Sequence, residues 1–180
     1  MIEAYLDKLE QACRAKGVDK FEIRYQCEAN AALQVYEQKV SDARDNSSES
    51  VSLVVLQDGK KGRFETADFD EAKIPLVVDE ALANARAVDT EETFFFHDGS
   101  GDYHQVMPYR PLAELAELDK IRFLKDLERL AYEADGRINK VIKTCLAEGR
   151  RTLTIRNSLG LNLNRETNRA YAYICLLYTS

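Results

Sequence analysis

The two histidines are the side chains of this sequence that offer the widest choice of chemistry. His97 and His104 are the only histidines, and they flank Asp98 and Asp102 in the segment HDGSGDYH. Histidine and carboxylate groups are common zinc ligands, but a zinc site needs three or four of them in tetrahedral geometry. The spacing here fits no helical or turn-based metal motif, nor the acid spacing of a calcium loop. We therefore interpret the segment as a solvated connector and predict neither a catalytic residue nor a metal ligand in it.

The four cysteines are the other possible nucleophiles, and they lie at Cys13, Cys27, Cys145 and Cys175 without a C-x-x-C pair. Cys27 and Cys145 fall at apolar positions of expected strands, where a free cysteine behaves as a small hydrophobic side chain. A cysteine nucleophile needs a partnered base, and no histidine lies outside the connector. We expect free thiols and no disulfide framework, as is typical of a reducing compartment such as the cytoplasm.

Other catalytic signatures are missing from the sequence. It contains no G-x-S-x-G, and Gly59 and Gly62 are explained by a hairpin and not by a phosphate-binding loop. The start, MIEAYLDKLEQ, lacks the basic and apolar regions of a signal peptide, and no run has the length of a membrane helix. We expect a cytoplasmic protein with no membrane partner.

Charge is distributed unevenly along the chain, whose 180 residues carry a net charge of −6. Between Arg137 and Ile174 there are eight basic residues and two acidic ones. Such a segment is typical of a nucleic-acid-binding face. Because no known motif accompanies it, charged positions on the solvated side of strands explain it more simply. Nucleic acid is therefore disfavoured as a partner, and an interaction module that binds nucleic acid or an acidic partner through residues 137–174 is the alternative function.

The first half of the chain predicts an α+β layer. A helix ends at Gly17, FEIRYQCE alternates as a strand, and Leu33–Val40 follows as a second strand. SDARDNSSES is either a loop or a polar edge strand. Asp58 and Gly59 predict a tight turn between strands at 51–56 and 61–65, and Pro75 fits the first turn of a second helix. We expect helices covering one face of a largely antiparallel sheet of four strands.

The second half repeats the order of helix and strands after a long connection. TFFFHDGSGDYHQ and two prolines mark a connector at 89–111. A helix then ends near Gly136, two strands join at Glu148–Gly149, a turn spans Asn157–Gly160, and the chain continues extended. We predict an N-terminal α+β domain at 1–88 and, at 112–174, the start of a middle domain that the chain does not complete.

The order of these segments resembles the N-terminal half of the TldD/PmbA family of zinc metallopeptidases, also described as modulators of DNA gyrase. The resemblance extends from about Leu6 to Ile174, and its most specific pieces are DGKKGRFET, EALANA, ADGRINKV and RNSLG. The family-motif positions, which we interpret as structural, are Asp58, Gly59, Gly62, Thr66, Asn157, Ser158 and Gly160. The acidic tract after the second helix is more similar to the PmbA branch than to TldD.

The resemblance implies a cytoplasmic subunit that forms homodimers or TldD–PmbA heterodimers and acts on peptides and small unfolded proteins. In the TldD branch, a downstream His-Glu-x-x-x-His helix supplies the zinc ligands and a general base. Neither His97 nor His104 lies in such a motif. The expected function is thus that of an N-terminal fragment of a metallopeptidase subunit, with the zinc-bearing half outside this chain.

The last six residues, CLLYTS, raise a separate question. They can be encoded by TGTCTCTTATACACATCT, the end sequence of a transposon used to prepare sequencing libraries. We interpret 175–180 as adaptor read-through inside the middle region. The alternative is a genuine strand, which Leu176, Leu177 and Tyr178 would suit.

Overall fold

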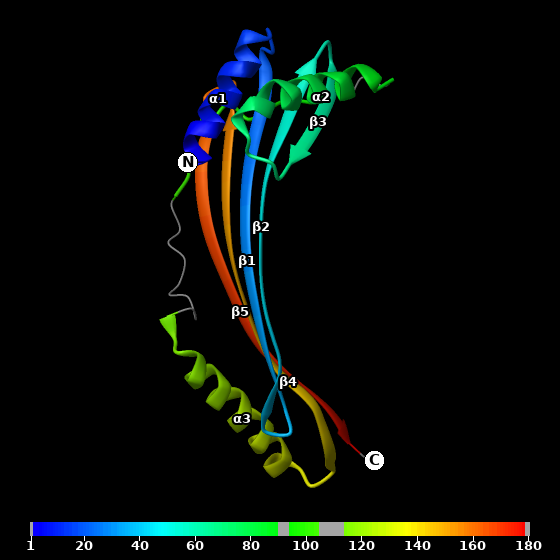
Figure 1. Ribbon diagram of the computed structural model, residues 1–180, viewed down its shortest axis with the longest axis vertical. Helices are drawn as coiled ribbons and strands as arrows, with labels where there is room; N and C mark the ends of the chain where they lie inside the picture. The colour runs from blue at the N-terminus through cyan, green and yellow to red at the C-terminus, as the bar shows by residue number, and fades with distance from the viewer. Residues whose placement is uncertain (1, 90–93, 105–113, 179–180) are drawn as a thin grey trace. The chain divides into compact units, whose positions relative to one another are not determined.

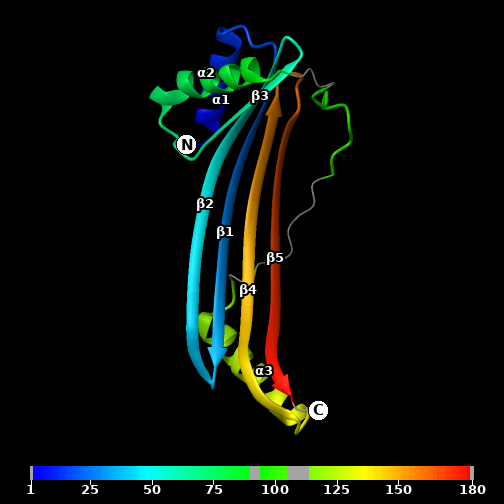
Figure 2. The same ribbon diagram turned by 90° about the vertical axis from the view of Figure 1, so that its right-hand side faces the viewer.

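The computed structural model describes residues 2–89, 94–104 and 114–178. The elements in chain order are α1 (Ile2–Ala15), β1 (Lys20–Tyr36), β2 (Lys39–Gln57), β3 (Lys60–Thr66), a 3-10 turn (Glu71–Lys73), α2 (Ile74–Ala87), α3 (Glu117–Ala134), β4 (Ile138–Asn157) and β5 (Asn162–Tyr178). The strands form one sheet in the order β3-β2-β1-β4-β5, and adjacent long strands run in opposite directions (Figure 1, Figure 2). The predicted α+β class is confirmed. No described helix is both long and apolar enough to cross a membrane.

The predicted hairpin is present, but the strands around it are longer than the sequence suggested. β2 and β3 pair antiparallel from Val51↔Thr66 to Gln57↔Lys60. The prediction of two strands at 21–28 and 33–40 is wrong, because β1 runs without interruption to Tyr36. The turn follows at Glu37 and Gln38, whose φ angles are 50° and 60°. The first half therefore contributes three strands and not four.

The polar segment at 41–50 is a strand and not a loop. It lies within β2, and its side chains are nearly all exposed. β3 pairs only with Val51–Gln57, so the preceding part of β2 has β1 on one side and forms an edge of the sheet. Of the two alternatives, the polar edge strand is confirmed. Polar side chains are typical of such edges because they discourage pairing with other chains.

The prediction of a strand break at Glu148–Gly149 is also wrong. β4 is continuous from Ile138 to Asn157, and the predicted turn at 157–160 then leads into β5. Of the predicted connector at 89–111, residues 90–93 and 105–111 lie outside the described part of the chain, as do Thr179 and Ser180.

The contacts divide the chain into two compact units, each built from several stretches of sequence. The described residues of the first unit are 2–27, 48–89, 94–104 and 152–165, and those of the second are 28–47, 114–151 and 166–178. β1, β2, β4 and β5 each contribute residues to both units.

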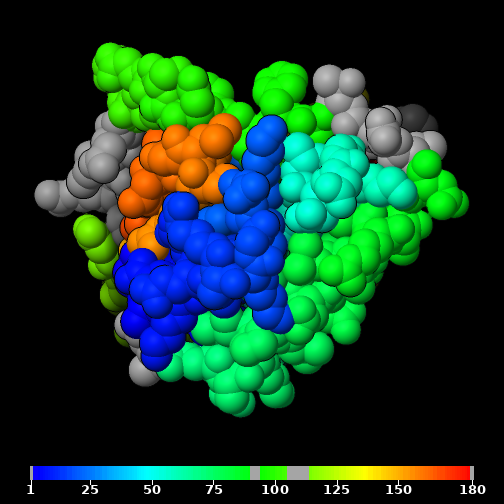
Figure 3. All heavy atoms as spheres, turned by 90° about the horizontal axis from the view of Figure 1, so that it is seen from above, coloured from blue at the N-terminus to red at the C-terminus, as the bar shows by residue number. Residues whose placement is uncertain are grey.

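The core of the first unit lies between α1, α2 and the sheet. The buried residues recur at helical spacing on both helices and are Tyr5, Leu6, Leu9 and Cys13 on α1, and Ile74, Val77, Val78, Ala81, Leu82 and Ala85 on α2. Figure 3 shows α1 (dark blue) against α2 (green) and against the orange end of β4 and β5. At that end Arg156 of β4, only 14% exposed, pairs with Glu3 and with Asp7 of α1. The two partner carboxylates are each 59% exposed, so solvent screens both ion pairs in part.

The second unit has a smaller core, in which α3 packs on the sheet. Leu33 and Val35 of β1, Leu124 of α3 and Leu146 of β4 are buried together, with Ile121 partly buried against them. Glu128 of α3 is also buried, at 1% exposure. Its carboxylate accepts hydrogen bonds from the backbone N–H groups of Glu37 (2.9 Å) and Gln38 (2.7 Å), so α3 holds the β1–β2 turn.

Candidate functional site

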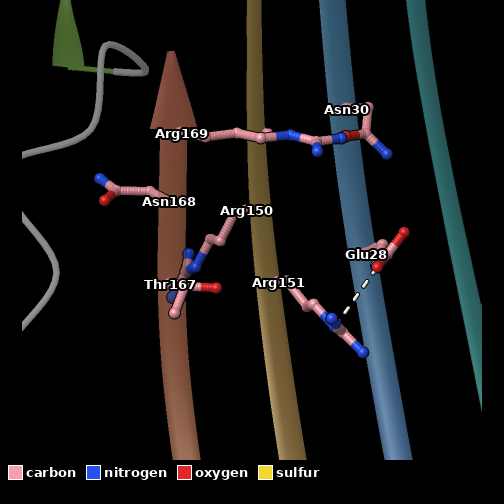
Figure 4. A pocket seen from close by; sticks show the side chains of 8 residues that line it. Glu28, Asn30, Arg150, Arg151, Thr167, Asn168 and Arg169 are labelled. Atoms are coloured by element: carbon pink, nitrogen blue, oxygen red, sulfur yellow. Dashed lines mark hydrogen bonds and ion pairs between the residues drawn. The ribbon is translucent and has the colours of Figure 1, made fainter.

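A glycine in the middle of β4 allows an arginine to cross the sheet in the second unit. A Cβ atom on Gly149 would lie 2.7 Å from Asn30 Oδ1 and 3.1 Å from Arg169 Nε. The Arg169 side chain starts on β5, passes over β4 at this position and donates from Nη2 to Asn30 Oδ1 of β1 at 3.3 Å (Figure 4). A glycine inside a strand often marks a close approach of another group. Here the group is the guanidinium of Arg169. Gly149 therefore serves this close approach inside β4 and not the turn that the sequence predicted.

A small basic pocket of about 190 Å³ surrounds this crossing. Arg150 pairs with Glu166 at 2.7 Å. Arg151 pairs with Glu28 at 3.4 Å, as the dashed line in Figure 4 shows. Both arginine side chains remain about half exposed, at 61% and 49%. The pocket is lined by Glu28, Asn30, Gly149, Arg150, Arg151, Thr167, Asn168 and Arg169. Three guanidinium groups and only one lining carboxylate make it suited to an anionic group.

Two tyrosines continue the line of Arg169 along β5. Alternation along a strand places residues 169, 171 and 173 on one face. The rings of Tyr171 and Tyr173 are stacked, with centroids 6.2 Å apart and planes 19° apart. Lys143 Nζ of β4 lies 5.4 Å from the centre of the Tyr173 ring, and its hydrogen bond to Tyr173 raises the pKa of Lys143. Lys143 therefore stays charged at neutral pH, and the ring carries a cation at its side.

A second pocket, of about 420 Å³, lies in the same unit at the start of α3. Its floor contains an ion pair between Lys120 Nζ and Glu148 Oε1 at 2.6 Å, with side-chain exposures of 14% and 21%. The lining residues come from β1, β2, β4 and α3 and are Ala31, Ala32, Leu33, Ala43, Arg44, Asp45, Leu115, Glu117, Lys120, Leu146 and Glu148. The walls are largely aliphatic, and Ala43–Asp45 belong to the polar edge part of β2. This pocket is suited to an apolar side chain.

The predicted connector residues His97, Asp98, Asp102 and His104 line neither pocket. His97 Nδ1 accepts a hydrogen bond from the N–H of Gly99 at 3.0 Å and lies 3.0 Å from the hydroxyl of Tyr103. The His104 side chain is 86% exposed. Among residues 2–89, 94–104 and 114–178, no group of three or more His, Cys, Asp or Glu side chains is arranged to hold a metal ion. A zinc ion thus does not fit the side chains described here.

The family-motif residues of the hairpin lie in the first unit and shape its backbone. Asp58 and Gly59 have φ angles of 51° and 75°, as the predicted turn requires. Gly62 faces α2, where an added Cβ would lie 2.0 Å from the carbonyl oxygen of Ala81. The hydroxyl of Thr66 accepts from the N–H of Asp68 at 3.0 Å.

The family-motif residues of the β4–β5 turn also bind backbone groups. Asn157 Oδ1 accepts from the N–H groups of Leu159 and Leu161, and its Nδ2 donates to the carbonyl of His97 at 2.7 Å. The N–H of Ser158 donates to the carbonyl of Phe21, and its hydroxyl accepts from the N–H of Phe21. Gly160 has a φ of 100°. None of the seven motif residues lines either pocket.

Neither pocket was predicted from the sequence, and nor was the row of Arg169, Tyr171 and Tyr173 on β5. A signal for the row exists in RAYAY, where planar groups recur at every second residue of an expected strand. No comparable signal marks the pockets, because their walls combine residues from strands far apart in the sequence.

Comparison with known proteins gives a family match and a set of similar folds. Residues 110–178 match the family model described as the PmbA/TldA metallopeptidase central domain. No curated protein matches. A proposed modulator of a DNA gyrase from Thermotoga maritima is 20% identical, with a TM-score of 0.81 over 99% of this chain and 44% of that one.

Two further solved structures have the same fold. TldE from Thermococcus kodakarensis is 20% identical, with a TM-score of 0.76 over 96% of this chain and 40% of that one. A proposed modulator of DNA gyrase from Bacteroides thetaiotaomicron is 16% identical, with a TM-score of 0.82 over 98% of this chain and 41% of that one. The chain therefore spans less than half the length of these solved proteins.

Proposed function

Because the chain belongs to the TldD/PmbA family, we propose that it is part of a metallopeptidase subunit acting on peptides or small unfolded proteins. The observation that carries the proposal is the match of residues 110–178 to the metallopeptidase central domain. Since the described side chains offer no zinc site, we place the metal ligands in a part of the protein outside these residues. The role assigned to this chain is to bind substrate and support the catalytic part.

The edge of β2 and the larger pocket are the features suited to a peptide. An unpaired strand edge presents backbone N–H and C=O groups that an extended peptide can pair with, and pockets beside it select side chains. The part of β2 before Val51 has an open edge, and Ala43 and Arg44 from that part line the larger pocket. We propose that an extended peptide pairs with β2 and places an aliphatic side chain in the pocket.

The test uses the full-length protein, recovered from the uninterrupted reading frame, with its zinc content and its cleavage of an unstructured peptide measured together. Ala43→Trp fills the larger pocket from an exposed position, and Ser41→Trp adds the same side chain to β2 outside the lining residues. We expect Ala43→Trp to raise KM for the peptide with little change in kcat, because it removes binding without touching the metal. Ser41→Trp should leave KM unchanged. Equal effects of the two variants would exclude the pocket as a substrate site.

Assembly follows from the same proposal. We propose a homodimer or a heterodimer with a TldD-type subunit, the latter if the full-length protein is PmbA-like and binds no zinc. Light scattering with zinc analysis separates these cases. A zinc-free protein that gains peptidase activity only when mixed with a TldD-type subunit would establish the heterodimer, whereas a zinc-free monomer that stays inactive in the mixture would refute the proposal.

A further inference from the structure

We infer that one face of the sheet in the second unit binds single-stranded nucleic acid, through a planar row formed by Arg169, Tyr171 and Tyr173. The inference is independent of the peptidase proposal, since it concerns a different class of ligand and none of these three residues lines the larger pocket. It rests on three observations: an exposed face, stacked rings and a surplus of cations next to them.

The planar row lies on the sheet face opposite α3. On β1, Leu33 packs against α3, and Asn30 lies three positions away. On β4, Leu146 packs against α3, and Gly149 likewise lies three positions away. Because successive strand side chains point to opposite faces, Asn30 and Gly149 belong to the face away from the helix. Arg169 bridges those two residues and therefore shares that face with Tyr171 and Tyr173.

The rings of Tyr171 and Tyr173 are only partly covered, by each other and by Lys143 Nζ over the Tyr173 ring. The exposures of Tyr171 and Tyr173 are 55% and 39%, although rings of this size are usually buried more fully in a sheet. Proteins that bind single strands without sequence preference use exposed aromatic rings on which bases stack. The guanidinium of Arg169 is held over β4 by Asn30 of β1, so it lies beside the two rings on the same sheet face and not in line with them. There it adds a cation and a flat group on which a base can also stack.

The charges around the row suit a phosphate backbone. Lys143 lies beside Tyr173, and Arg151 and Arg169 line the basic pocket. Glu28, which pairs with Arg151, is the one carboxylate among the residues lining that pocket. A purely electrostatic site for an acidic peptide would not need exposed stacked rings, and a duplex keeps its base faces inside. The combination of rings and cations therefore favours a single strand over both.

The experiment measures fluorescence anisotropy of a labelled oligothymidylate of about 16 nucleotides as the 180-residue chain is titrated in at several salt concentrations. Tyr171→Ala with Tyr173→Ala should weaken binding by about tenfold or more, because the stacking surface is lost. Tyr171→Phe with Tyr173→Phe should bind as the parent does, since phenylalanine keeps the ring. Arg151→Ala should reduce the slope of log K against log salt by about 0.7, the value for one phosphate contact of a single strand.

Matched controls remove a tyrosine and an arginine elsewhere. Tyr103→Ala removes a 44% exposed ring in the connector, and Arg129→Ala removes a cation that pairs with Asp126 and Glu133 on α3. Both should leave affinity and slope unchanged. No binding at low salt would overturn the inference, and so would binding that the tyrosine-to-alanine pair leaves intact. Equal affinity for a duplex, or equal competition by polyglutamate, would show a site for charge alone and would also overturn it.

Discussion

Gly62 shows how a single missing side chain fixes the packing of an element. The space for its Cβ is filled by the backbone of α2, with the Ala81 carbonyl oxygen 2.0 Å and the Ala85 nitrogen 2.5 Å from the position it would take. Backbone atoms of a helix cannot move aside as a flexible side chain can. The family-motif glycine at this position is thus explained by the contact of β3 with α2, and not by the hairpin turn alone.

We expect Gly62→Ala to lower the free energy of unfolding by about 1–3 kcal/mol, the usual cost of adding volume to a packed site. Urea unfolding followed by far-UV circular dichroism measures the change. Gly136→Ala is the matched control, because no atom lies within 4 Å of its added Cβ and its φ is not in the left-handed region. The explanation fails if the two variants lose the same stability.

The buried thiol of Cys13 makes the stability of the first unit depend on pH. Burial in the first unit raises the pKa of the Cys13 thiol from 9.0 to about 12. Between these values the unfolded chain loses the thiol proton and the folded chain keeps it. The stability contribution of the neutral thiol is therefore complete below pH 9 and is lost as the pH rises toward 12.

The expected result is a decrease in unfolding free energy of up to about 1.4 kcal/mol per pH unit from this group. Urea midpoints at several alkaline pH values measure it. Cys13→Ala should show a shallower pH dependence than the parent, since alanine has no proton to lose. The same slope in both proteins would assign the alkaline loss to other groups.

At the scale of elements, the β1–β2 and β2–β3 turns both contain residues with positive φ, but only the β2–β3 turn could be predicted from the sequence. Asp58 and Gly59 are residue types that favour positive φ, so the β2–β3 turn was evident from the sequence. Glu37 and Gln38 are not, and the β1–β2 turn was placed wrongly. Its cause lies 90 residues away, where the Glu128 carboxylate binds the N–H of Gln38. A local pattern cannot report a turn that a distant side chain stabilises.

The helices and the basic pocket also differ in whether a local sequence pattern or a distant residue determines them. On α1 and α2 the buried residues are apolar and recur at helical spacing, a local pattern that can be seen in the sequence. On α3 the same spacing marks Leu124 but not the buried Glu128, whose burial depends on the turn it binds. Gly149 was assigned to a turn because glycine is the usual turn residue. Its role became visible only when the sheet brought Asn30 and Arg169 together across it.

A double-mutant cycle tests whether Glu128 stabilises the β1–β2 turn. Glu128→Ala should cost about 1–3 kcal/mol of unfolding free energy, since it leaves the part-buried N–H groups of Glu37 and Gln38 without a charged acceptor. Replacing Glu37 and Gln38 with Asn and Gly gives the turn residues that favour positive φ on their own. We expect this replacement to offset part of the Glu128→Ala loss, as urea unfolding of the four proteins would show. Strictly additive effects would mean that Glu128 and the turn act independently. Glu133→Ala, which removes an exposed partner of Arg129, is the control with little expected loss.

At the scale of the whole molecule, an acidic protein is proposed to bind an anionic polymer. The net charge is −6, while residues 137–174 carry a surplus of basic side chains. The salt concentration decides whether a bound ligand interacts only with the nearby basic side chains or also with the net negative charge of the molecule. At an ionic strength of about 0.1 M the Debye length is about 10 Å, so a nucleic acid bound on the planar row interacts mainly with the cations beside it. At about 0.01 M the length is about 30 Å, and the acidic remainder of the chain also acts on the ligand.

We therefore predict that the plot of log K against log salt for the oligothymidylate is linear at moderate salt and flattens at the lowest concentrations. Counterion release alone gives a straight line whose slope reflects the number of phosphates contacted. The flattening comes from repulsion by acidic side chains that are screened at higher salt. Anisotropy titrations across this range measure the curve. Replacing exposed acids distant in sequence from the row, such as Asp19 and Asp89, with Asn should restore part of the linearity. A line that stays straight and equally steep down to the lowest salt would show that the net charge of the molecule has no influence on this face.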